Sequence, residues 1–291
     1  MAEPSNAPDP AGPASFENGC GIHAVRVPGF LVADAASGSV LGYDADGVHQ
    51  GQFGAAVLDE PTDVTWGPGG DLYVADFGAS AVFRFDGLTG EALGLAYLDR
   101  QVLEEPMAIR ATEDVLLTLG NDTSNVAVTR PDGGLAFSFG DPSLVWPLAM
   151  DVDADHRWVY VGRSGTEGAR IERYSIDGGP RSTSFGADLG LGPVRGVALG
   201  CGETLYATDG EALLRFQLDP YGGADVVKHW ELRDAARMRL GPDGRLYVVA
   251  GRDLLRLDDD DTLRSAVRFA DEVAARGVEF AAPPVEPGFG A

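Results

Sequence analysis

Three carboxylates in this 291-residue sequence could carry out acid–base chemistry. They are Glu60, Asp63 and Glu105, and all three fall at the start of a predicted strand. A carboxyl group that faces like charges in a recessed site can have its pKa raised towards neutrality, which suits a general acid or base. The same three groups could instead hold a calcium ion, because calcium prefers oxygen ligands.

A set of arginines could bind the anion on which such chemistry would act. Arg195, Arg237 and Arg276 come at strand starts in three neighbouring repeats, and Arg252 lies on an adjoining loop. We expect these arginines to face the three carboxylates from the opposite side of the site. A guanidinium group binds carboxylate or phosphate through a planar fork of hydrogen bonds, so converging arginines would select a small anion. The alternative is that these arginines only pair with the abundant acidic residues and neutralise the charge around the site.

Two further residues complete the predicted substrate-binding set. Trp146 precedes Pro147 at a strand start, where its ring could stack on a ligand or pack into the core. Asn121 falls on a loop between a second and a third strand at the same end of the molecule. We expect this loop, residues 121–125, and the loop at residues 163–169 to act as a lid.

The composition excludes several other functions. The chain has 45 Asp and Glu residues against 22 Lys and Arg, a net charge of −23, which disfavours binding to nucleic acids and anionic membranes. Lys228 is the only lysine, so Schiff-base chemistry has one candidate. Cys20 and Cys201 cannot supply a cysteine-type zinc site and allow at most one disulfide.

Histidine is nearly absent from the predicted site. By the register of the repeats, His49 and His229 fall on outer strands and His156 falls in a turn at the opposite face. Only His23, near the N-terminus, could reach the site. Ser-His-Asp and Cys-His catalysis are therefore not expected, because both need an imidazole beside the nucleophile.

An internal repeat positions all these residues. Residues 61–86 contain three short alternating strands between turns rich in Gly, Pro and Asp, and the pattern returns four times with a period of about 41 to 47 residues. A less regular fourth strand closes each unit. Four antiparallel strands per unit, without helical periodicity, are typical of a propeller blade.

The two ends of the chain predict a sixth blade. Residues 275–280 match a first strand, whereas residues 30–34 and 39–44 match second and third strands that lack a first. The sequence therefore predicts an all-β, six-bladed β-propeller of four-stranded antiparallel blades, closed by one blade built from both termini. We expect it to span residues 26–283, between a flexible tail at residues 1–25 and another at 284–291.

The motifs Leu72-Tyr-Val-Ala-Asp76 and Val82-Phe-Arg-Phe-Asp86 resemble NHL-type repeats and the wider superfamily of gluconolactonase/senescence-marker and strictosidine-synthase-like proteins. The resemblance covers roughly residues 28–283 and implies a lactonase, a lyase, a cyclising synthase or an interaction module. In the resembling lactonases, an Asn or Asp after the proline at the strand starts holds a divalent cation. Here the matching positions are occupied by Thr62, Met107, Leu148, Arg195, Ala236 and Arg276, so we predict no such metal site.

The sequence thus predicts a small-molecule enzyme of the lyase, hydrolase or cyclase/isomerase type, acting on an anionic or zwitterionic metabolite. The alternative is a non-catalytic NHL-type propeller for protein interaction or ligand sensing. No cofactor is required by the residues, although a divalent cation such as calcium is compatible with them. The sequence shows neither a signal peptide nor a transmembrane segment, so we expect a cytoplasmic monomer without nucleic-acid or membrane partners.

Overall fold

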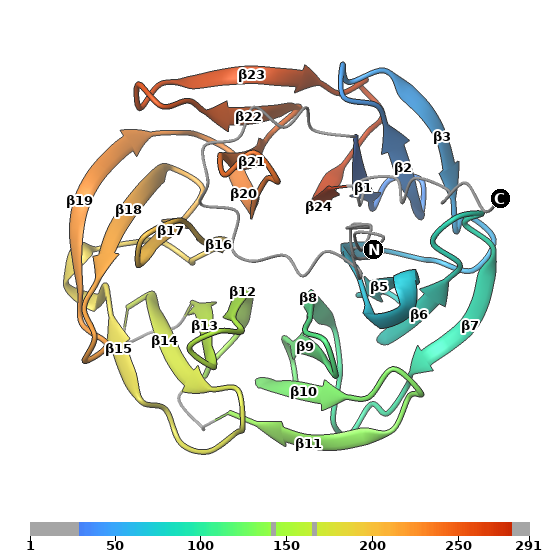
Figure 1. Cartoon of the computed structure of the whole chain (residues 1–291), viewed down its shortest axis with the longest axis horizontal. Coiled ribbons are helices and arrows are strands. Elements are labelled where there is room, and N and C mark those ends of the chain that lie inside the picture. The colour runs from blue at the N-terminus through green and yellow to red at the C-terminus, as the bar shows by residue number, and fades with distance from the viewer. Residues whose placement is uncertain (1–28, 141–143, 165–167, 281–291) are drawn as a thin grey trace, which may run out of the picture.

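Six four-stranded antiparallel sheets form a closed ring in the computed structural model, which describes residues 29–140, 144–164 and 168–280 (Figure 1). The predicted six-bladed β-propeller is confirmed. The predicted tails, with Cys20 and His23, lie outside the described residues.

We number the five continuous blades in chain order. Blade 1 contains β4 (Pro61–Trp66), β5 (Leu72–Asp76), β6 (Ala81–Phe85) and β7 (Ala92–Tyr97), and blade 2 contains β8 (Pro106–Ala111), β9 (Leu116–Gly120), β10 (Asn125–Thr129) and β11 (Leu135–Phe139). Blade 3 contains β12 (Pro147–Asp153), β13 (Trp158–Arg163), β14 (Arg170–Ser175) and β15 (Thr183–Phe185), and blade 4 contains β16 (Gly196–Leu199), β17 (Thr204–Thr208), β18 (Ala212–Leu218) and β19 (Ala224–Glu231). Blade 5 contains β20 (Ala235–Leu240), β21 (Leu246–Ala250), β22 (Asp253–Leu257) and β23 (Leu263–Arg268), and the split blade contains β24 (Ala275–Phe280), β1 (Phe30–Asp34), β2 (Ser39–Tyr43) and β3 (His49–Phe53). In the described part of the chain, helix is limited to the single turns η1 (Pro68–Gly70) and η2 (Ala187–Leu189), and no helix could span a bilayer.

The hydrophobic core consists of six layers, one between each pair of neighbouring blades. For example, Leu119 and Val126 of blade 2 pack with Met150 and Val161 of blade 3. In each blade, the inner strands are therefore buried on both faces. This explains why second strands such as Leu72–Asp76 are buried along their whole length instead of alternating between apolar and polar residues.

Aspartates at the ends of second strands fix the hairpin turns that follow. The Asp76 carboxylate accepts a hydrogen bond from the backbone N–H of Ala79, and the Asp209 carboxylate accepts from Glu211 and Ala212. Asp34 accepts from Ala36 in the same way. These bonds satisfy turn N–H groups that have no strand partner.

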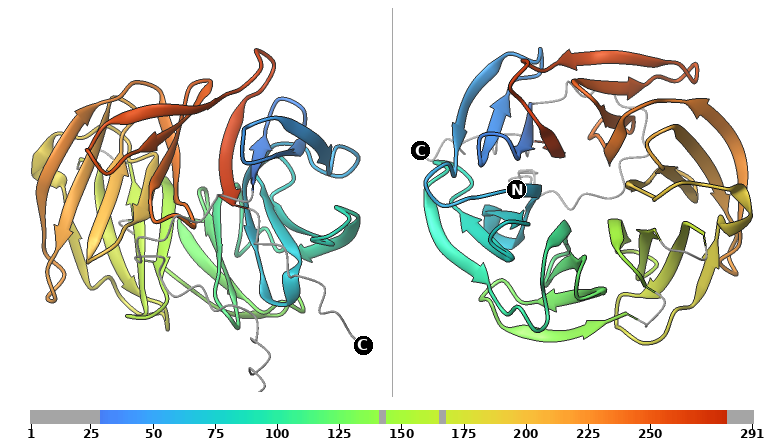
Figure 2. Two further views of the ribbon diagram at one scale, coloured as in Figure 1. Left: turned by 45° about the horizontal axis from the view of Figure 1, so that its top comes forward. Right: turned by 180° about the vertical axis from the view of Figure 1, so that it is seen from behind.

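Strand β24 closes the ring. It pairs along its length with β1, although the two strands lie at opposite ends of the chain (Figure 2). Its Val278 and Phe280 belong to the core layer between blade 5 and the split blade. The indole N–H of Trp66 in blade 1 also donates to the Phe280 carbonyl at 2.9 Å, which ties the closing strand to the next blade.

Removing β24 should abolish cooperative folding. A chain that ends at residue 274 exposes the edge of β1 and loses Val278 and Phe280 from a core layer, so we expect no sharp thermal transition by circular dichroism. A chain that ends at Phe280 keeps every described strand and serves as the control. Equal melting midpoints for the two truncated chains would show that closure by β24 is not required.

Candidate functional site

An irregularity at the start of the innermost strand, found in five of the six blades, directs side chains towards the ring axis. In four blades the pairing of the innermost strand with its neighbour skips one residue, and in blade 5 it skips two. An extra residue in a strand forms a bulge that re-aims its side chain. The skipped residues are Thr62, Met107, Leu148, Arg276 and the pair Ala236 and Arg237.

Together with Arg195, which directly precedes β16, these bulged residues surround a pocket of about 530 Å³. All six positions that the repeat register aligned therefore meet at one place. The lining consists of Glu60, Thr62, Phe77, Met107, Asn121, Trp146, Leu148, Ser164, Pro193, Arg195, Ala236, Arg237 and Arg276.

The charged residues of the pocket lining are all on one side of the ring. Blades 2 and 3 contribute the apolar side chains of Met107, Leu148 and Trp146, and the Trp146 residue is 59% exposed. Blades 4, 5, the split blade and blade 1 contribute all the charged residues, which are Arg195, Arg237, Arg276 and Glu60. This arrangement suits a ligand with an anionic end and an apolar body.

Arg237 crosses the channel at the base of the pocket. Its guanidinium donates to the carbonyl oxygens of Met107 at 3.0 Å, Arg195 at 2.7 Å and Leu148. These carbonyls belong to three different blades, so one side chain joins four of the six blades. Burial lowers the pKa of Arg237 to about 10, the nearby charges of Arg110 and Arg276 act in the same direction, and Asp63 opposes them.

The other two arginines remain available at the mouth. Arg195 is exposed, and its guanidinium has no ion-pair partner in the described part of the chain. Arg276 approaches Glu60 at 4.0 Å, and both side chains are about half exposed. An exposed pair at this distance contributes little to stability, so an incoming anion can compete for Arg276.

The position of Glu60 differs from the prediction in one respect. We expected the carboxylates to face the arginines from across the channel. Blade 1 instead neighbours the split blade in the ring, so Glu60 lies beside Arg276. Among the described residues, Glu60 is the only carboxylate that lines the pocket.

Asp63 turns away from the pocket into the channel below it, because the bulge falls on Thr62. Asp63 is 2% exposed, and its carboxylate accepts from Arg110 at 2.5 Å and from the backbone N–H of Ile109 at 3.1 Å. A carboxylate held in this way is a structural partner of a buried guanidinium. The expectation that Asp63 faces the mouth is wrong.

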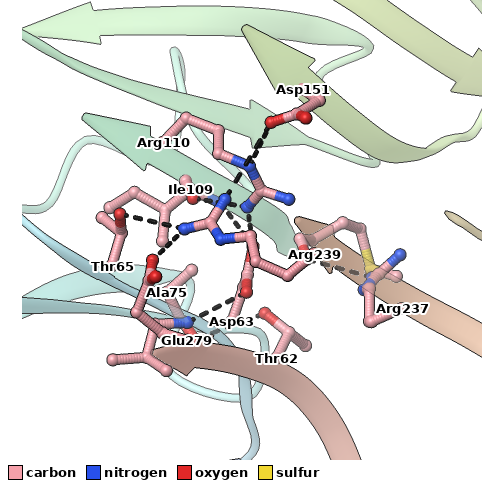
Figure 3. Close-up of polar contacts among 12 residues, drawn as sticks. Thr62, Asp63, Thr65, Ala75, Ile109, Arg110, Asp151, Arg237, Arg239 and Glu279 are labelled. Atoms are coloured by element: carbon pink, nitrogen blue, oxygen red, sulfur yellow. Dashed lines mark hydrogen bonds and ion pairs between the residues drawn. The ribbon is translucent and has the colours of Figure 1, made fainter. Parts of the chain in front are cut away.

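Asp63 belongs to a network of charged side chains that lines the channel (Figure 3). Arg110 donates to Asp63 and, at 2.8 Å, to Asp151. Asp151 also accepts from the backbone N–H of Leu199 at 2.8 Å. Arg239 of blade 5 lies 3.9 Å from Asp151 and pairs with Glu279 of the split blade, so the network reaches all six blades.

Two other predicted site residues lie outside the pocket lining. Arg252 pairs with Asp271 and donates to the carbonyl oxygen of Phe269 at 3.0 Å. Glu105 is partly buried, and burial together with the charges of Asp122, Glu104 and Glu60 raises its pKa. Neither side chain belongs to the pocket lining, so a role for either of them in the site stays a prediction.

The three carboxylates considered for calcium are not gathered around one point. Asp63 is committed to Arg110, and within the described ranges no three His, Cys, Asp or Glu side chains are arranged to hold a metal ion. The Thr62 hydroxyl, the one weak oxygen ligand at the aligned positions, donates to the Pro106 carbonyl at 2.7 Å.

The histidines lie where the register predicted. His49 is on β3 and His229 is on β19, which are outer strands, and His156 is in the turn between β12 and β13. His156 pairs with Asp153, and this hydrogen bond raises its pKa. None of these three residues lines the pocket.

The expected lid is not present at Asn121. The segment from Asn121 to Asn125 is a turn of the same length as those after β1 and β5. The Asn121 side chain donates to the Pro147 carbonyl at 3.1 Å, so it fixes the chain beside Trp146. Part of the second expected lid, residues 165–167, lies outside the described residues.

Comparisons with known proteins identify the fold. No protein-family model and no curated protein sequence matches the chain. A propeller in a crystal structure of a nidogen/laminin complex matches with a TM-score of 0.70 and 15% identity over 87% of this chain and 98% of that one. A streptogramin B lyase matches with a TM-score of 0.64 and 12% identity over 89% and 96% of the two chains.

A third similar structure is a virginiamycin B lyase from Staphylococcus aureus, in a form inactivated by replacing one histidine with alanine and bound to quinupristin. It matches with a TM-score of 0.61 and 11% identity over 82% of this chain and 84% of that one. These identities support a shared propeller fold and nothing finer.

Replacing Asp63 should destabilise the protein. Asp63→Asn leaves Arg110 as a buried cation with one carboxylate fewer, and breaking a buried pair of this kind costs about 3–5 kcal/mol of unfolding free energy. Asp271→Asn, which removes the exposed partner of Arg252, is the matched control and should cost less than about 1 kcal/mol. Urea denaturation measures both values, and equal losses would contradict the structural role of Asp63.

Proposed function

We propose that the protein is a small-molecule enzyme that binds an organic anion in the pocket and uses Glu60 as its general acid or base. The observation that carries this proposal is the free guanidinium of Arg195. In a chain with 45 acidic residues, this exposed cation has no ion-pair partner among the described residues and lines a pocket with Arg276. A site left open in this way favours an external anion as the partner.

The charges at the mouth support a role for Glu60. Arg276 is 4.0 Å from Glu60. An anion that binds Arg195 and Arg276 would draw Arg276 away from Glu60 and leave that carboxylate beside the bound molecule. Glu60 would then take a proton from the ligand or return one, which suits a lyase, hydrolase or cyclase/isomerase reaction.

The histidines also favour this assignment. The virginiamycin B lyase with one histidine replaced is inactive, whereas no described histidine of this chain lines the pocket. If this protein catalyses an elimination, its proton transfer therefore falls to a different group. Glu60 is the titratable carboxylate in the right place.

The alternative function is protein interaction through the outer surface. Leu95 on β7 is 55% exposed and Phe137 on β11 is 36% exposed, and these are the outer strands of neighbouring blades. The propeller from the nidogen/laminin complex has the same fold. This alternative predicts that Leu95→Ser and Phe137→Ser abolish binding to a protein partner, while substitutions in the pocket leave that binding unchanged.

The pocket arginines should determine anion binding. Arg195→Ala removes charge-assisted hydrogen bonds worth about 1.5–3 kcal/mol, so small carboxylic acids that raise the melting temperature of the wild type should bind at least about tenfold more weakly. Arg252→Ala is the matched control, because Arg252 lies outside the pocket. Equal stabilisation of both variants by the same acids would refute the anion site.

Replacing Glu60 should separate an effect on catalysis from an effect on binding. Glu60→Gln keeps the size of the side chain but cannot exchange a proton, so turnover of an identified substrate should fall by about 100-fold or more while its binding is retained. Steady-state kinetics beside calorimetric binding distinguishes the two effects. Wild-type turnover in this variant would remove Glu60 from the mechanism.

A further inference from the structure

Trp146 lines the pocket together with the apolar side chains of Met107 and Leu148. The equivalent position, directly before the strand-start proline, is Glu60 in blade 1 and Glu105 in blade 2. Blade 3 instead places a large aromatic ring there, 59% exposed and lining the pocket. An exposed tryptophan in a concave site is a binding surface for another flat apolar group.

The backbone holds Trp146 from both sides. Its φ of 47° is in the left-handed region, which a bulky side chain adopts only where its surroundings impose it. The Trp146 carbonyl accepts from the Ser164 N–H at 3.3 Å, and the Pro147 carbonyl accepts from the Asn121 side chain at 3.1 Å. Asn121 is therefore a positioning residue for the indole.

The contacts of Arg237 show that Arg195 lies near the apolar side chains of blade 3. One nitrogen of Arg237 donates to the carbonyls of both Leu148 and Arg195. The backbones of blades 3 and 4 thus approach each other closely at the pocket base. A flat ligand resting on Trp146 and Leu148 lies next to the blade that carries the Arg195 guanidinium.

The charge balance of the site favours a ligand with one negative charge. Below the pocket, the acids Asp63, Asp151 and Glu279 balance Arg110, Arg239 and the pocket-base residue Arg237. Among the residues that line the mouth, Arg195 and Arg276 outnumber the one carboxylate, Glu60, so one positive charge of the lining has no negative counterpart in it. A carboxylate matches this charge and the planar fork of a guanidinium group.

We propose that the ligand is an aromatic monocarboxylate, with its ring against Trp146 and the apolar side chains of Met107 and Leu148, and its carboxylate on Arg195. This inference rests on the proposed function, because it takes the same pocket as the substrate site. It adds the chemical class of the substrate. It also assigns Trp146 as the residue that selects for an aromatic body.

Calorimetric titration of the full chain with three probes tests the proposal. The probes are 2-naphthoate, cyclohexanecarboxylate, which lacks the aromatic ring, and 2-naphthamide, which lacks the charge. We expect 2-naphthoate to bind the wild type at least about threefold to tenfold more tightly than either analogue, as expected for an added ring contact or ion pair.

Substitutions assign the two contacts. Trp146→Ala should weaken 2-naphthoate about threefold to tenfold and weaken cyclohexanecarboxylate less, so that the preference shrinks, whereas Trp146→Phe should retain most of the preference. Arg195→Ala should weaken both carboxylates. Because Trp146 is exposed, an unchanged melting temperature checks that the Trp146 variants are folded.

The outcomes distinguish this inference from the proposed function. Equal affinity for 2-naphthoate and cyclohexanecarboxylate, or an unchanged preference in Trp146→Ala, overturns the aromatic selectivity but keeps the anion site. If no carboxylate binds, or if Arg195→Ala changes nothing, the anion site fails and the aromatic proposal fails with it.

Discussion

The pairing of buried charges around the axis is the interaction on which the ring depends. Hydrophobic layers join each blade only to its two neighbours, and six such layers would allow the ring to open at any one of them. The network of Arg110, Asp63, Asp151, Arg239 and Glu279 joins strands from blades on different sides of the channel. Since these ions are removed from bulk water, each needs its partner in place. The ring must therefore close correctly before the charges are satisfied.

This constraint also separates two kinds of arginine in one sequence. Arg110 and Arg239 have carboxylate partners in the channel, and Arg237 has backbone carbonyls. Arg195 lines the pocket, and in the described part of the chain its guanidinium pairs with neither a carboxylate nor a backbone carbonyl. Each of the three framework arginines, Arg110, Arg237 and Arg239, therefore has partners within the protein. For this reason, the charge that remains at the mouth is available to a ligand.

The fold could be predicted from the sequence because its signals are local and repeated. Second strands such as Leu72–Asp76 and Leu246–Ala250 are short apolar runs at a regular spacing, and the ends of the chain complement each other. The six aligned mouth positions also meet as predicted. Asp63 was misplaced because a bulge shifts the register by one residue, and adjacent residues in a strand point to opposite sides.

The channel network could not be predicted, because its members are scattered in the sequence. Asp151 and Glu279 are ordinary polar residues of alternating strands, and only the closed ring brings them to the same arginine, Arg239. The sequence of β20 also does not show that Arg237 crosses the axis to the carbonyls of three other blades, because Arg237 lies in a bulge that re-aims its side chain.

Because Arg237 spans the channel, the pocket has a base as well as a mouth. A molecule that enters at the mouth meets the Arg237 guanidinium, which the carbonyl oxygens of Met107, Leu148 and Arg195 hold at the base, so we expect it to leave through the same mouth. For a reaction that yields two products, the one nearer the opening departs first. The architecture of the ring would then influence the order of product release, together with the affinity of each product.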